Sequence, residues 1–244
     1  MSINPKVQIK VLVFEGCPHA EAALKLSQAV AKRFDPGIIV ERVPVDTPEK
    51  ATELGFLGSP SILVNGKDIE NKKTSHGTLC CRTYEDNLGI PPEWLIEAAV
   101  LRAVNARGLL FLCVANSARS QMAEGIARTL LPSEIKVWSA GSHPTKVRPE
   151  AITVLDEIGI DISENYSKNV IDIPVSEVDT VITLCAEEEC PLFLGKATRL
   201  HWGLPDPAGM QGSNDERLAS FRKVRDELYR RINLLKTCED SGGR

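Results

Sequence analysis

An apolar run that ends in a cysteine is followed by a short loop and by a helical pattern that begins with an arginine and a serine. The run covers residues 109–112, the cysteine is Cys113, and the pair is Arg119 and Ser120. A loop between a strand and a helix N-terminus directs backbone N–H groups inward, where the helix dipole adds partial positive charge. The Arg119 guanidinium can bind two oxygens of a tetrahedral oxyanion at once. These surroundings favour the nucleophilic thiolate form of Cys113, so the loop predicts an oxyanion pocket with a sulfur nucleophile at its base.

The length and charge of the chain limit the classes of protein to which it can belong. Its 244 residues suffice for two hydrophobic cores, and its net charge of −4 lacks the basic excess of a nucleic-acid-binding protein. No apolar run approaches the roughly 20 residues that span a bilayer, and the first residues lack the pattern of a secretory signal. We therefore expect a cytoplasmic protein without nucleic-acid or membrane partners. In that compartment, seven cysteines argue against a framework of structural disulfides.

Apolar periodicity predicts an α/β fold in two domains, of which the first covers residues 1–106. Its expected elements, in the order β-α-β-α-β-β and then a last helix, include strands over 6–14 and 37–45, a helix capped by Thr47 over 47–54, a strand and hairpin over 58–67, and a helix near 92–105. The residues at helical spacing in its first helix are Ala23, Leu26, Val30 and Phe34. Asn65 and Gly66 form the expected hairpin turn.

The second domain is predicted to cover residues 107–244 and to alternate strands with helices. Strands are expected over 109–112, 135–139 and 178–184, and helices over 119–131, over 149–158 and after a capping box at Ser213. This alternation implies a mostly parallel sheet flanked by helices. Cys113 then stands at the C-terminal end of a strand, where sheets of this kind bind ligands.

Several motifs of the second domain carry a resemblance to a known family. They are residues 113–125, 139–141, 159–163, 181–185, 190–191 and 201–208. In these motifs, residues 108 to about 237 resemble the thioredoxin-coupled arsenate reductases, which share the low-molecular-weight tyrosine phosphatase fold. The loop after Cys113 is common to phosphatases and reductases. Cys185 and Cys190 separate the two, because reducing arsenate requires two electrons, which thiols supply by exchange.

The resemblance implies a cascade of three thiols. Cys113 attacks arsenate and forms a thiol–arsenic adduct, while Asp206 protonates the leaving oxygen as general acid. Cys185 then attacks Cys113 and releases arsenite, and Cys190 attacks Cys185. The resulting disulfide is left for a thiol reductant, thioredoxin or a similar protein.

The resemblance also implies roles for the loop and for a neighbouring charge. The residues expected to bind the substrate are Asn116, Ser117, Arg119 and Ser120. Arg119 would hold the oxyanion, Ser120 would hydrogen-bond the Cys113 sulfur, and Asn116 would brace the loop. Potassium-binding relatives have an aspartate where this chain has Lys168, whose own charge could take the place of the ion beside Glu124. We expect no metal and no cofactor.

The first domain resembles the thioredoxin fold over residues 5 to about 100. Cys17 lies between the first strand and the first helix, where thioredoxins carry their attacking thiol, and Pro60 matches their cis-proline. The second cysteine of the thioredoxin motif is absent, so a partner for Cys17 has to come from Cys80 or Cys81. The domain is then an electron donor to the reductase or a docking module. Similar small domains associated with organomercurial lyases leave carbon–mercury cleavage as a third hypothesis.

Two other hypotheses stay open for the second domain. A low-molecular-weight protein tyrosine phosphatase would use the same loop, but this chain has only three tyrosines, none of them beside Asp206 to hold a phosphotyrosine ring. A non-enzymatic module that binds arsenite or senses thiols would use Cys113, Cys185 and Cys190 as soft ligands. Cys238, in the C-terminal tail, is expected to be inert.

Overall fold

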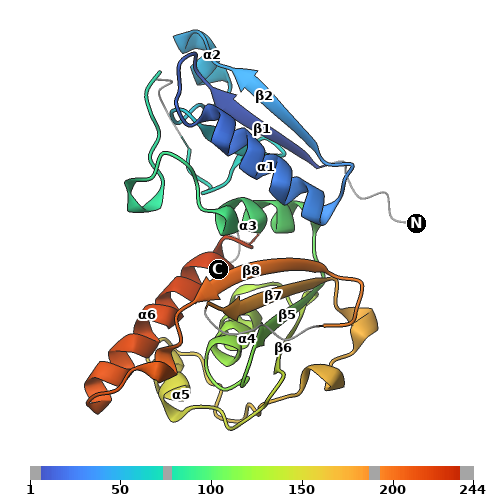
Figure 1. Cartoon of the computed structure of the whole chain (residues 1–244), viewed down its shortest axis with the longest axis vertical. Coiled ribbons are helices and arrows are strands. Elements are labelled where there is room, and N and C mark those ends of the chain that lie inside the picture. The colour runs from blue at the N-terminus through green and yellow to red at the C-terminus, as the bar shows by residue number, and fades with distance from the viewer. Residues whose placement is uncertain (1–6, 74–78, 187–192, 237–244) are drawn as a thin grey trace. The chain divides into compact units, whose positions relative to one another are not determined.

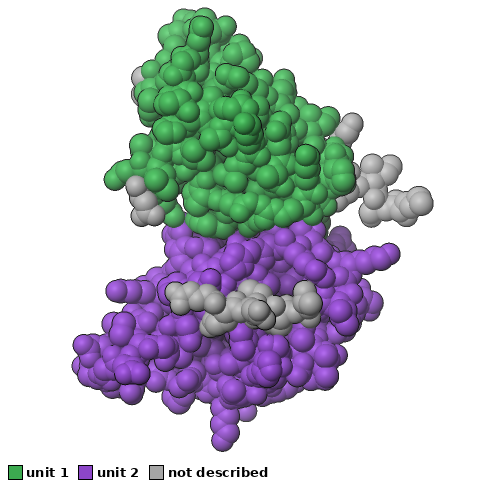
Figure 2. Space-filling model, viewed as in Figure 1, with its two compact units in different colours: residues 1–105 green, residues 106–244 purple. Residues whose placement is uncertain are grey.

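The computed structural model of this chain describes residues 7–73, 79–186 and 193–236. Cys190 and Cys238, two of the cysteines considered above, lie outside the described residues. The chain divides into two compact units, residues 1–105 (unit 1) and residues 106–244 (unit 2) (Figure 1, Figure 2). Each unit has a four-stranded sheet of its own. Within the described part of the chain, no helix combines the length and apolar character needed to cross a membrane.

Unit 1 contains a mixed sheet in the order β2-β1-β3-β4. Strand β1 runs parallel to β2 and antiparallel to β3, and β3 turns back into β4. The strands are β1 (Gln8–Val13), β2 (Ile39–Pro44), β3 (Ser61–Val64) and β4 (Lys67–Asp68). The helices are α1 (Ala20–Phe34), α2 (Pro48–Glu53) and α3 (Glu93–Val104), with a 3₁₀ turn, η1 (Glu85–Asn87), before α3.

Local signals set the caps and turns of unit 1. The hydroxyl of Thr47 accepts a hydrogen bond from the Lys50 amide at 3.2 Å, and Pro48 is the first residue of α2, which confirms the predicted cap. Asn65 and Gly66 have left-handed φ angles of 49° and 78°, which confirms the predicted hairpin turn. These short-range contacts fix where α2 begins and how β3 is joined to β4.

The buried face of α1 follows the apolar spacing of its sequence only in part. Ala23 and Val30 are buried as expected, whereas Leu26 and Phe34 are only half-buried and Ser27 is fully buried in their place. Ser27 can be buried because its hydroxyl donates a hydrogen bond to the Ala23 carbonyl at 2.8 Å. The helix therefore presents mainly small residues where it contacts β1 and β2.

Unit 2 contains an entirely parallel sheet in the order β6-β5-β7-β8. The strands are β5 (Gly108–Cys113), β6 (Lys136–Gly141), β7 (Thr180–Cys185) and β8 (Thr198–Leu204). The helices are α4 (Arg119–Leu130), α5 (Pro149–Asp156) and α6 (Asn214–Asn233), and the 3₁₀ turns are η2 (Val170–Asp172), η3 (Val175–Glu177) and η4 (Pro207–Gly209). The predicted parallel sheet flanked by helices is confirmed for this unit.

The helices and turns of unit 2 cover the sheet. Helices α4, α5 and α6 pack against one another, and α4 contacts β5 and β6 (Figure 1). Ser213 begins α6 with the predicted capping box, in which its hydroxyl accepts from the Glu216 amide and the Glu216 carboxylate accepts from the Ser213 amide. Residues next to η2 and η3 pack against β5 and β7 in a second buried cluster. Its members include Leu110, Leu112, Ile173, Val178, Val181 and Phe193.

Strand β8 is not predicted from the sequence. Leu200, Trp202 and Leu204 are buried in alternation along it. Arg199 and His201 are exposed between them, as expected of a strand at the edge of a sheet. The period of two is therefore present in the sequence, but the polar residues make it weaker than the continuous apolar runs of β5 and β7.

Candidate active site

The loop between β5 and α4 lies at the C-terminal edge of the parallel sheet. The carbonyls of Val114, Ala115 and Ser117 accept hydrogen bonds from backbone amides of the segment 143–148 at 2.9–3.0 Å. In a trans peptide the N–H points away from the C=O, so the amides that follow these carbonyls face the inner side of the loop. Together with the first amides of α4, they form a set of donors suited to an oxyanion.

Two backbone features hold this loop in shape. Asn116 has a left-handed φ of 45°, a region that asparagine enters more readily than most residues. Gly141, at the end of β6, passes so close to the loop that a Cβ there would lie 2.4 Å from the carbonyl oxygen of Val114. Only glycine fits this close approach. The loop is therefore packed directly against the backbone of β6.

The thiol of Cys113 is buried at the base of the loop and bonded to a serine. The residue is 3% exposed, and its sulfur lies 2.9 Å from the hydroxyl oxygen of Ser120. The side-chain amide of Asn116 donates to that hydroxyl oxygen at 2.8 Å. The Ser120 hydroxyl can accept this bond and still donate its own proton to the Cys113 sulfur.

Asn116 also connects the thiol to a buried carboxylate, through Ser120 on one side and Ser139 on the other. Its side-chain amide donates to the Ser139 hydroxyl at 2.8 Å, and Ser139 donates in turn to Oε2 of Glu124, which is completely buried. Nζ of Lys168 lies 3.1 Å from the same oxygen, and Arg128 lies 2.5 Å from Oε1. The Arg128 contact is an ion pair only, because Oε1 has no aligned donor among the described residues. Glu124 is thus held between two cations.

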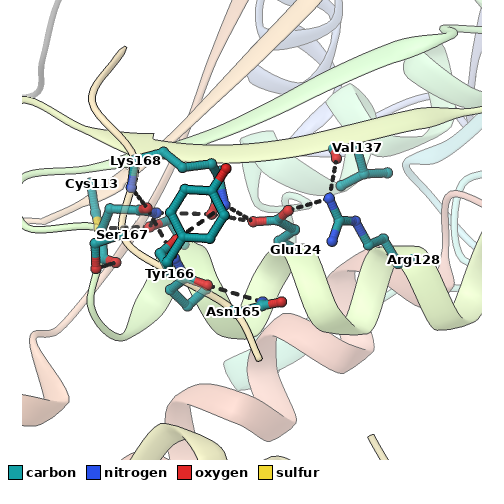
Figure 3. Close-up of polar contacts among 12 residues, drawn as sticks. Cys113, Glu124, Arg128, Val137, Asn165, Tyr166, Ser167 and Lys168 are labelled. Atoms are coloured by element: carbon teal, nitrogen blue, oxygen red, sulfur yellow. Dashed lines mark hydrogen bonds and ion pairs between the residues drawn. The ribbon is translucent and has the colours of Figure 1, made fainter. Parts of the chain in front are cut away.

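The segment that carries Lys168 braces the loop through its backbone as well. The Lys168 amide donates to the side-chain oxygen of Asn116 at 2.7 Å, and the Ser167 hydroxyl donates to the Asn116 carbonyl at 2.7 Å. The Lys168 ammonium lies 5.1 Å from the ring centroid of Tyr166 and 3.3 Å from its carbonyl oxygen (Figure 3). A single segment therefore fixes Asn116 and supplies a positive charge beside Glu124.

Arg119 joins the loop to β8 and to a carboxylate. Its side chain is buried, its NH1 donates to the Leu204 carbonyl at 3.1 Å, and its NH2 lies 3.6 Å from Oδ1 of Asp206. The Asp206 side chain is 43% exposed and caps η4 by accepting from the Ala208 amide at 3.3 Å. The Asp206 carboxyl group is therefore open to water and lies next to the guanidinium that the loop presents.

Cys185 lies at the end of β7, and β7 is the neighbour of β5, which ends in Cys113. It is the last residue of β7, which runs parallel to β5 with Thr183 opposite Leu112, so the two strands end at the same edge of the sheet. Cys185 is 1% exposed. The structure therefore brings two thiols of the predicted cascade to one edge, and the third, Cys190, lies outside the described residues.

Ser139 and Arg128 belong to this network but are not among the predicted site residues. Ser139 is a fully buried serine in a strand, and a buried hydroxyl requires hydrogen-bond partners. Arg128 follows Glu124 by one turn of α4, a spacing that places both side chains on one face of a helix. Ser117, one of the predicted substrate-binding residues, is buried in the loop, and its carbonyl accepts a hydrogen bond from the Arg148 amide.

The thiols of unit 1 are more accessible than those of unit 2. Cys17 is half-buried in the turn between β1 and α1, and Cys80 and Cys81 are exposed. The peptide bond between Ser59 and Pro60 is cis, and Ser59 forms a β-bridge with Cys81. Among the residues that the structure describes in both units, no group of three or more His, Cys, Asp or Glu side chains is arranged to hold a metal ion.

Known proteins match this chain over about half of its length. Residues 108–240 match the family of low molecular weight phosphotyrosine protein phosphatases. An arsenate reductase of Halalkalibacterium halodurans is 43% identical over 141 residues, which cover 57% of this chain and 99% of that relative. An arsenate reductase of Bacillus subtilis is 44% identical over 127 residues, which cover 51% of this chain and 91% of that relative. A solved structure of an arsenate reductase in the phosphate binding state is 36% identical with a TM-score of 0.46, and the match covers 53% of this chain and 96% of that one. The chain belongs to the low molecular weight phosphotyrosine protein phosphatase family.

Proposed function

We propose that this chain reduces arsenate to arsenite in unit 2 by a cascade of thiols. The relatives that are arsenate reductases, of which the chain covers 99% and 91%, support the reaction. The observation that carries the proposal is the buried thiol of Cys185. Cys185 is the last residue of β7, which is paired with β5, the strand that ends in Cys113. Hydrolysis of a phosphate ester has no use for a second thiol there, whereas a two-electron reduction requires one.

The first step forms a bond between sulfur and arsenic. The inward-facing amides of the loop and the guanidinium of Arg119 hold the oxygens of arsenate while the Cys113 thiolate attacks the arsenic atom. Asp206 gives its proton to the leaving oxygen, which departs as water. The Ser120 hydroxyl hydrogen-bonds the Cys113 sulfur before the attack, and Asn116 holds the loop around the substrate.

The electrons come from sulfur. The Cys185 thiolate attacks the sulfur of Cys113, the sulfur–arsenic bond breaks, and its electron pair stays with arsenic, which leaves as trivalent arsenite. Cys190 then attacks Cys185, which frees Cys113 and closes a disulfide between Cys185 and Cys190. Each turnover oxidises two thiols, so a thiol reductant such as thioredoxin has to restore them.

We further infer a thioredoxin-like fold and a role as electron donor for unit 1. The mixed sheet with β1 between β2 and β3, and the position of Cys17 between β1 and α1, support this inference. Cys17 would attack the disulfide between Cys185 and Cys190, and a short connection at residues 105–108 would keep both thiol systems at high effective concentration. A cytoplasmic location, where thiols stay reduced, suits this chemistry.

Arsenite release from arsenate tests the proposal, measured with candidate thiol reductants supplied one at a time. Multiple turnovers are expected with at least one dithiol reductant, and none with the Cys113→Ser variant. Arsenate turnover that survives in Cys113→Ser would contradict the cascade and favour a module that only binds arsenite through its thiols.

Phosphatase activity is the second candidate, because the family of this chain is one of phosphatases. Cys185→Ala separates the two functions, since ester hydrolysis needs Cys113 but not a resolving thiol. A reductase loses arsenite release in Cys185→Ala. A chain that releases no arsenite, and whose Cys185→Ala variant hydrolyses a phosphotyrosine analogue as fast as the wild type, is a phosphatase.

A further inference from the structure

The geometry points to Cys81, and not to the adjacent Cys80, as the thiol that forms a disulfide with Cys17. Cys80 and Cys81 are both exposed and are neighbours in sequence, so neither exposure nor sequence position separates them. The backbone pairing separates them. The inference concerns unit 1 and rests on the proposed function only for the disulfide that Cys17 reduces.

The segment that carries the two cysteines is paired with the chain before Pro60. The Ser59 amide donates to the Cys80 carbonyl at 2.8 Å, and the Arg82 amide donates to the Ser59 carbonyl at 3.0 Å, which makes a parallel bridge between Ser59 and Cys81. Bridged residues direct their side chains to the same side, and successive residues of an extended chain direct them to opposite sides. Cys81 therefore shares a side with Ser59, and Cys80 shares a side with Arg82.

Arg82 identifies the side on which Cys80 lies. Its guanidinium donates to the two carboxylate oxygens of Asp68 at 2.6 and 3.0 Å and to the Ser61 hydroxyl at 3.3 Å. Ser61 pairs with Leu12 across the sheet, and Asp68 pairs with Leu63. Both leucines belong to a buried cluster that includes Ala51 of α2. Arg82, and with it Cys80, is therefore directed to the side of the sheet that α2 covers.

Ser59 identifies the side on which Cys81 lies. The Ser59 hydroxyl accepts from the Phe14 amide at 3.4 Å, and the Phe14 carbonyl accepts from the Cys17 amide at 3.4 Å. Two hydrogen bonds thus connect Ser59 to the turn that carries Cys17. Cys81 is directed toward this turn, and Cys80 is directed away from it.

The backbone beside Cys81 is anchored while the thiol stays accessible. Arg82 is buried, donates to Glu70 at 2.7 Å and lies 4.4 Å from the ring centroid of Tyr84. Tyr84 donates its hydroxyl proton to the Pro60 carbonyl at 2.8 Å. Because these contacts already hold the segment in place, little further conformational entropy is lost when Cys81 forms a bond.

A disulfide between the two adjacent cysteines does not fit the same geometry. An extended chain directs the sulfurs of Cys80 and Cys81 apart, whereas a disulfide requires Cβ atoms about 3.5–4.5 Å from each other. Cys80 is therefore expected to remain a thiol when Cys17 is oxidised.

The reaction is a thiol–disulfide exchange. The Cys17 thiolate attacks a disulfide, in the proposed function that between Cys185 and Cys190, and one sulfur of that disulfide leaves as a thiolate that takes up a proton. Cys81 then loses its proton and attacks the Cys17 sulfur, and the second sulfur of the acceptor leaves. The acceptor has gained two electrons, and unit 1 holds a disulfide between Cys17 and Cys81 that an external dithiol reduces.

Mapping the disulfide in the full-length chain tests this inference. Wild-type, Cys80→Ser and Cys81→Ser proteins are equilibrated with mixtures of reduced and oxidised glutathione, alkylated, digested and analysed by mass spectrometry. Wild type and Cys80→Ser should give a linked Cys17–Cys81 peptide with the same dependence on the glutathione ratio. Cys81→Ser should leave Cys17 as a thiol or a glutathione adduct. A Cys17–Cys80 peptide in wild type, a missing linked peptide in wild type, or loss of the link in Cys80→Ser would overturn the inference.

The Cys113→Ser variant keeps this test apart from the test of the proposed function. It should release no arsenite and still give the Cys17–Cys81 peptide in the glutathione mixtures. If wild type reduces arsenate but forms no such peptide, the inference fails and the proposed function stands. If the peptide forms in a chain that cannot reduce arsenate, the proposed function fails and the inference stands.

Discussion

Each unit has a cysteine near the C-terminal end of its first strand, Cys113 as the last residue of β5 and Cys17 in the turn after β1, but the two units surround this cysteine in opposite ways. Cys113 is 3% exposed and its sulfur is hydrogen-bonded to Ser120, whereas Cys17 is half-buried in the turn between β1 and α1. A buried thiol inside a ring of donors suits a small oxyanion. An accessible thiol suits a disulfide, because the sulfur of another protein segment has to reach it.

The helices that follow show the same contrast. Helix α4 begins with Arg119 and has no acidic residue in its first turn, whereas α1 has Glu21 in its first turn. The dipole at a helix N-terminus favours a bound anion, and a carboxylate side chain competes for that position. The strand–loop–helix connection around the cysteine, which both units have, therefore does not make an anion site by itself. The charge of the first helical turn and the donors of the loop decide which chemistry the cysteine can perform.

The largest expected difference between the units is the effect of removing each thiol. Cys113→Ser should abolish arsenite release with every reductant, because a serine hydroxyl at neutral pH is far less nucleophilic than a thiolate. Cys17→Ser should lower turnover only with reductants that act through unit 1. Steady-state arsenite release measures both variants. If Cys17→Ser turns over at the wild-type rate with every reductant, Cys17 has no redox role and unit 1 is a docking module.

Asp206→Asn should slow the first step by roughly 10²–10⁴-fold, the usual contribution of a positioned general acid. Stability should change little, since the side chain is 43% exposed on a loop. Rapid-quench measurement of adduct formation gives the rate, and Asp156→Asn, an exposed aspartate of the same unit, is the matched control. An unchanged first step in Asp206→Asn would exclude this residue from catalysis.

Lys168→Met should lower the free energy of unfolding of unit 2 by roughly 1.5–3 kcal/mol, the range for a hydrogen bond to a charged group. The reason is that it removes one of the two cations beside the fully buried Glu124. Urea denaturation measures the change, and Lys168→Arg, which keeps the charge, should retain most of the stability. If Lys168→Met unfolds like the wild type, the ion pair with Arg128 alone is sufficient to hold the carboxylate.

The smallest expected effects concern the pH at which each unit loses stability. In unit 2, hydrogen bonds from Arg222 and then from Arg225 lower the pKa of Glu157 from its ordinary value of 4.5 to about 2. A depressed pKa in the folded state contributes stability above the ordinary value, and this contribution is lost as the pH falls from about 4.5 toward 2. In unit 1, burial raises the pKa of Tyr84 above its ordinary value of 10.0. The fold thus favours the neutral phenol, and stability is lost as the pH rises above that value.

Calorimetric unfolding over a range of pH checks these opposite trends. Glu157→Gln should make unit 2 less sensitive to acid, and Tyr84→Phe should make unit 1 less sensitive to alkali. Equal acid sensitivity of Glu157→Gln and wild type would show that other carboxylates determine the acid limit of unit 2. If Tyr84→Phe and wild type are equally sensitive to alkali, groups other than the Tyr84 phenol determine the alkaline limit of unit 1.

Local contacts explain why much of the fold could be predicted from sequence. The cap at Thr47, the turn at Asn65 and Gly66, and the capping box at Ser213 each involve residues no more than a few positions apart. Strand β8 escaped prediction because its burial comes from the neighbouring β7 and leaves every second residue polar. The apolar spacing does not mark Ser27 on the buried face of α1, because Ser27 satisfies its hydroxyl within the helix and takes a place that an apolar residue would otherwise fill.

The site divides in the same way. The loop residues are contiguous, so the sequence indicates them together. Ser139 and Arg128 take part through Glu124, whose burial depends on tertiary packing. The choice between Cys80 and Cys81 depends on a bridge between segments that are distant in sequence, and no local pattern encodes that register.

A single turnover without added reductant tests most directly the central claim, that Cys113 begins and Cys185 continues a thiol cascade on arsenate. Reduced Cys17→Ser protein, in which Cys17 cannot pass electrons on, is mixed with arsenate, and arsenite and disulfides are quantified by mass spectrometry. One arsenite per chain and a disulfide between Cys185 and Cys190 are expected. The double variant Cys17→Ser, Cys190→Ala should release the same amount of arsenite, and its reaction should stop at a disulfide between Cys113 and Cys185. Arsenite without either disulfide, or arsenite from protein that carries Cys113→Ser, would contradict the account.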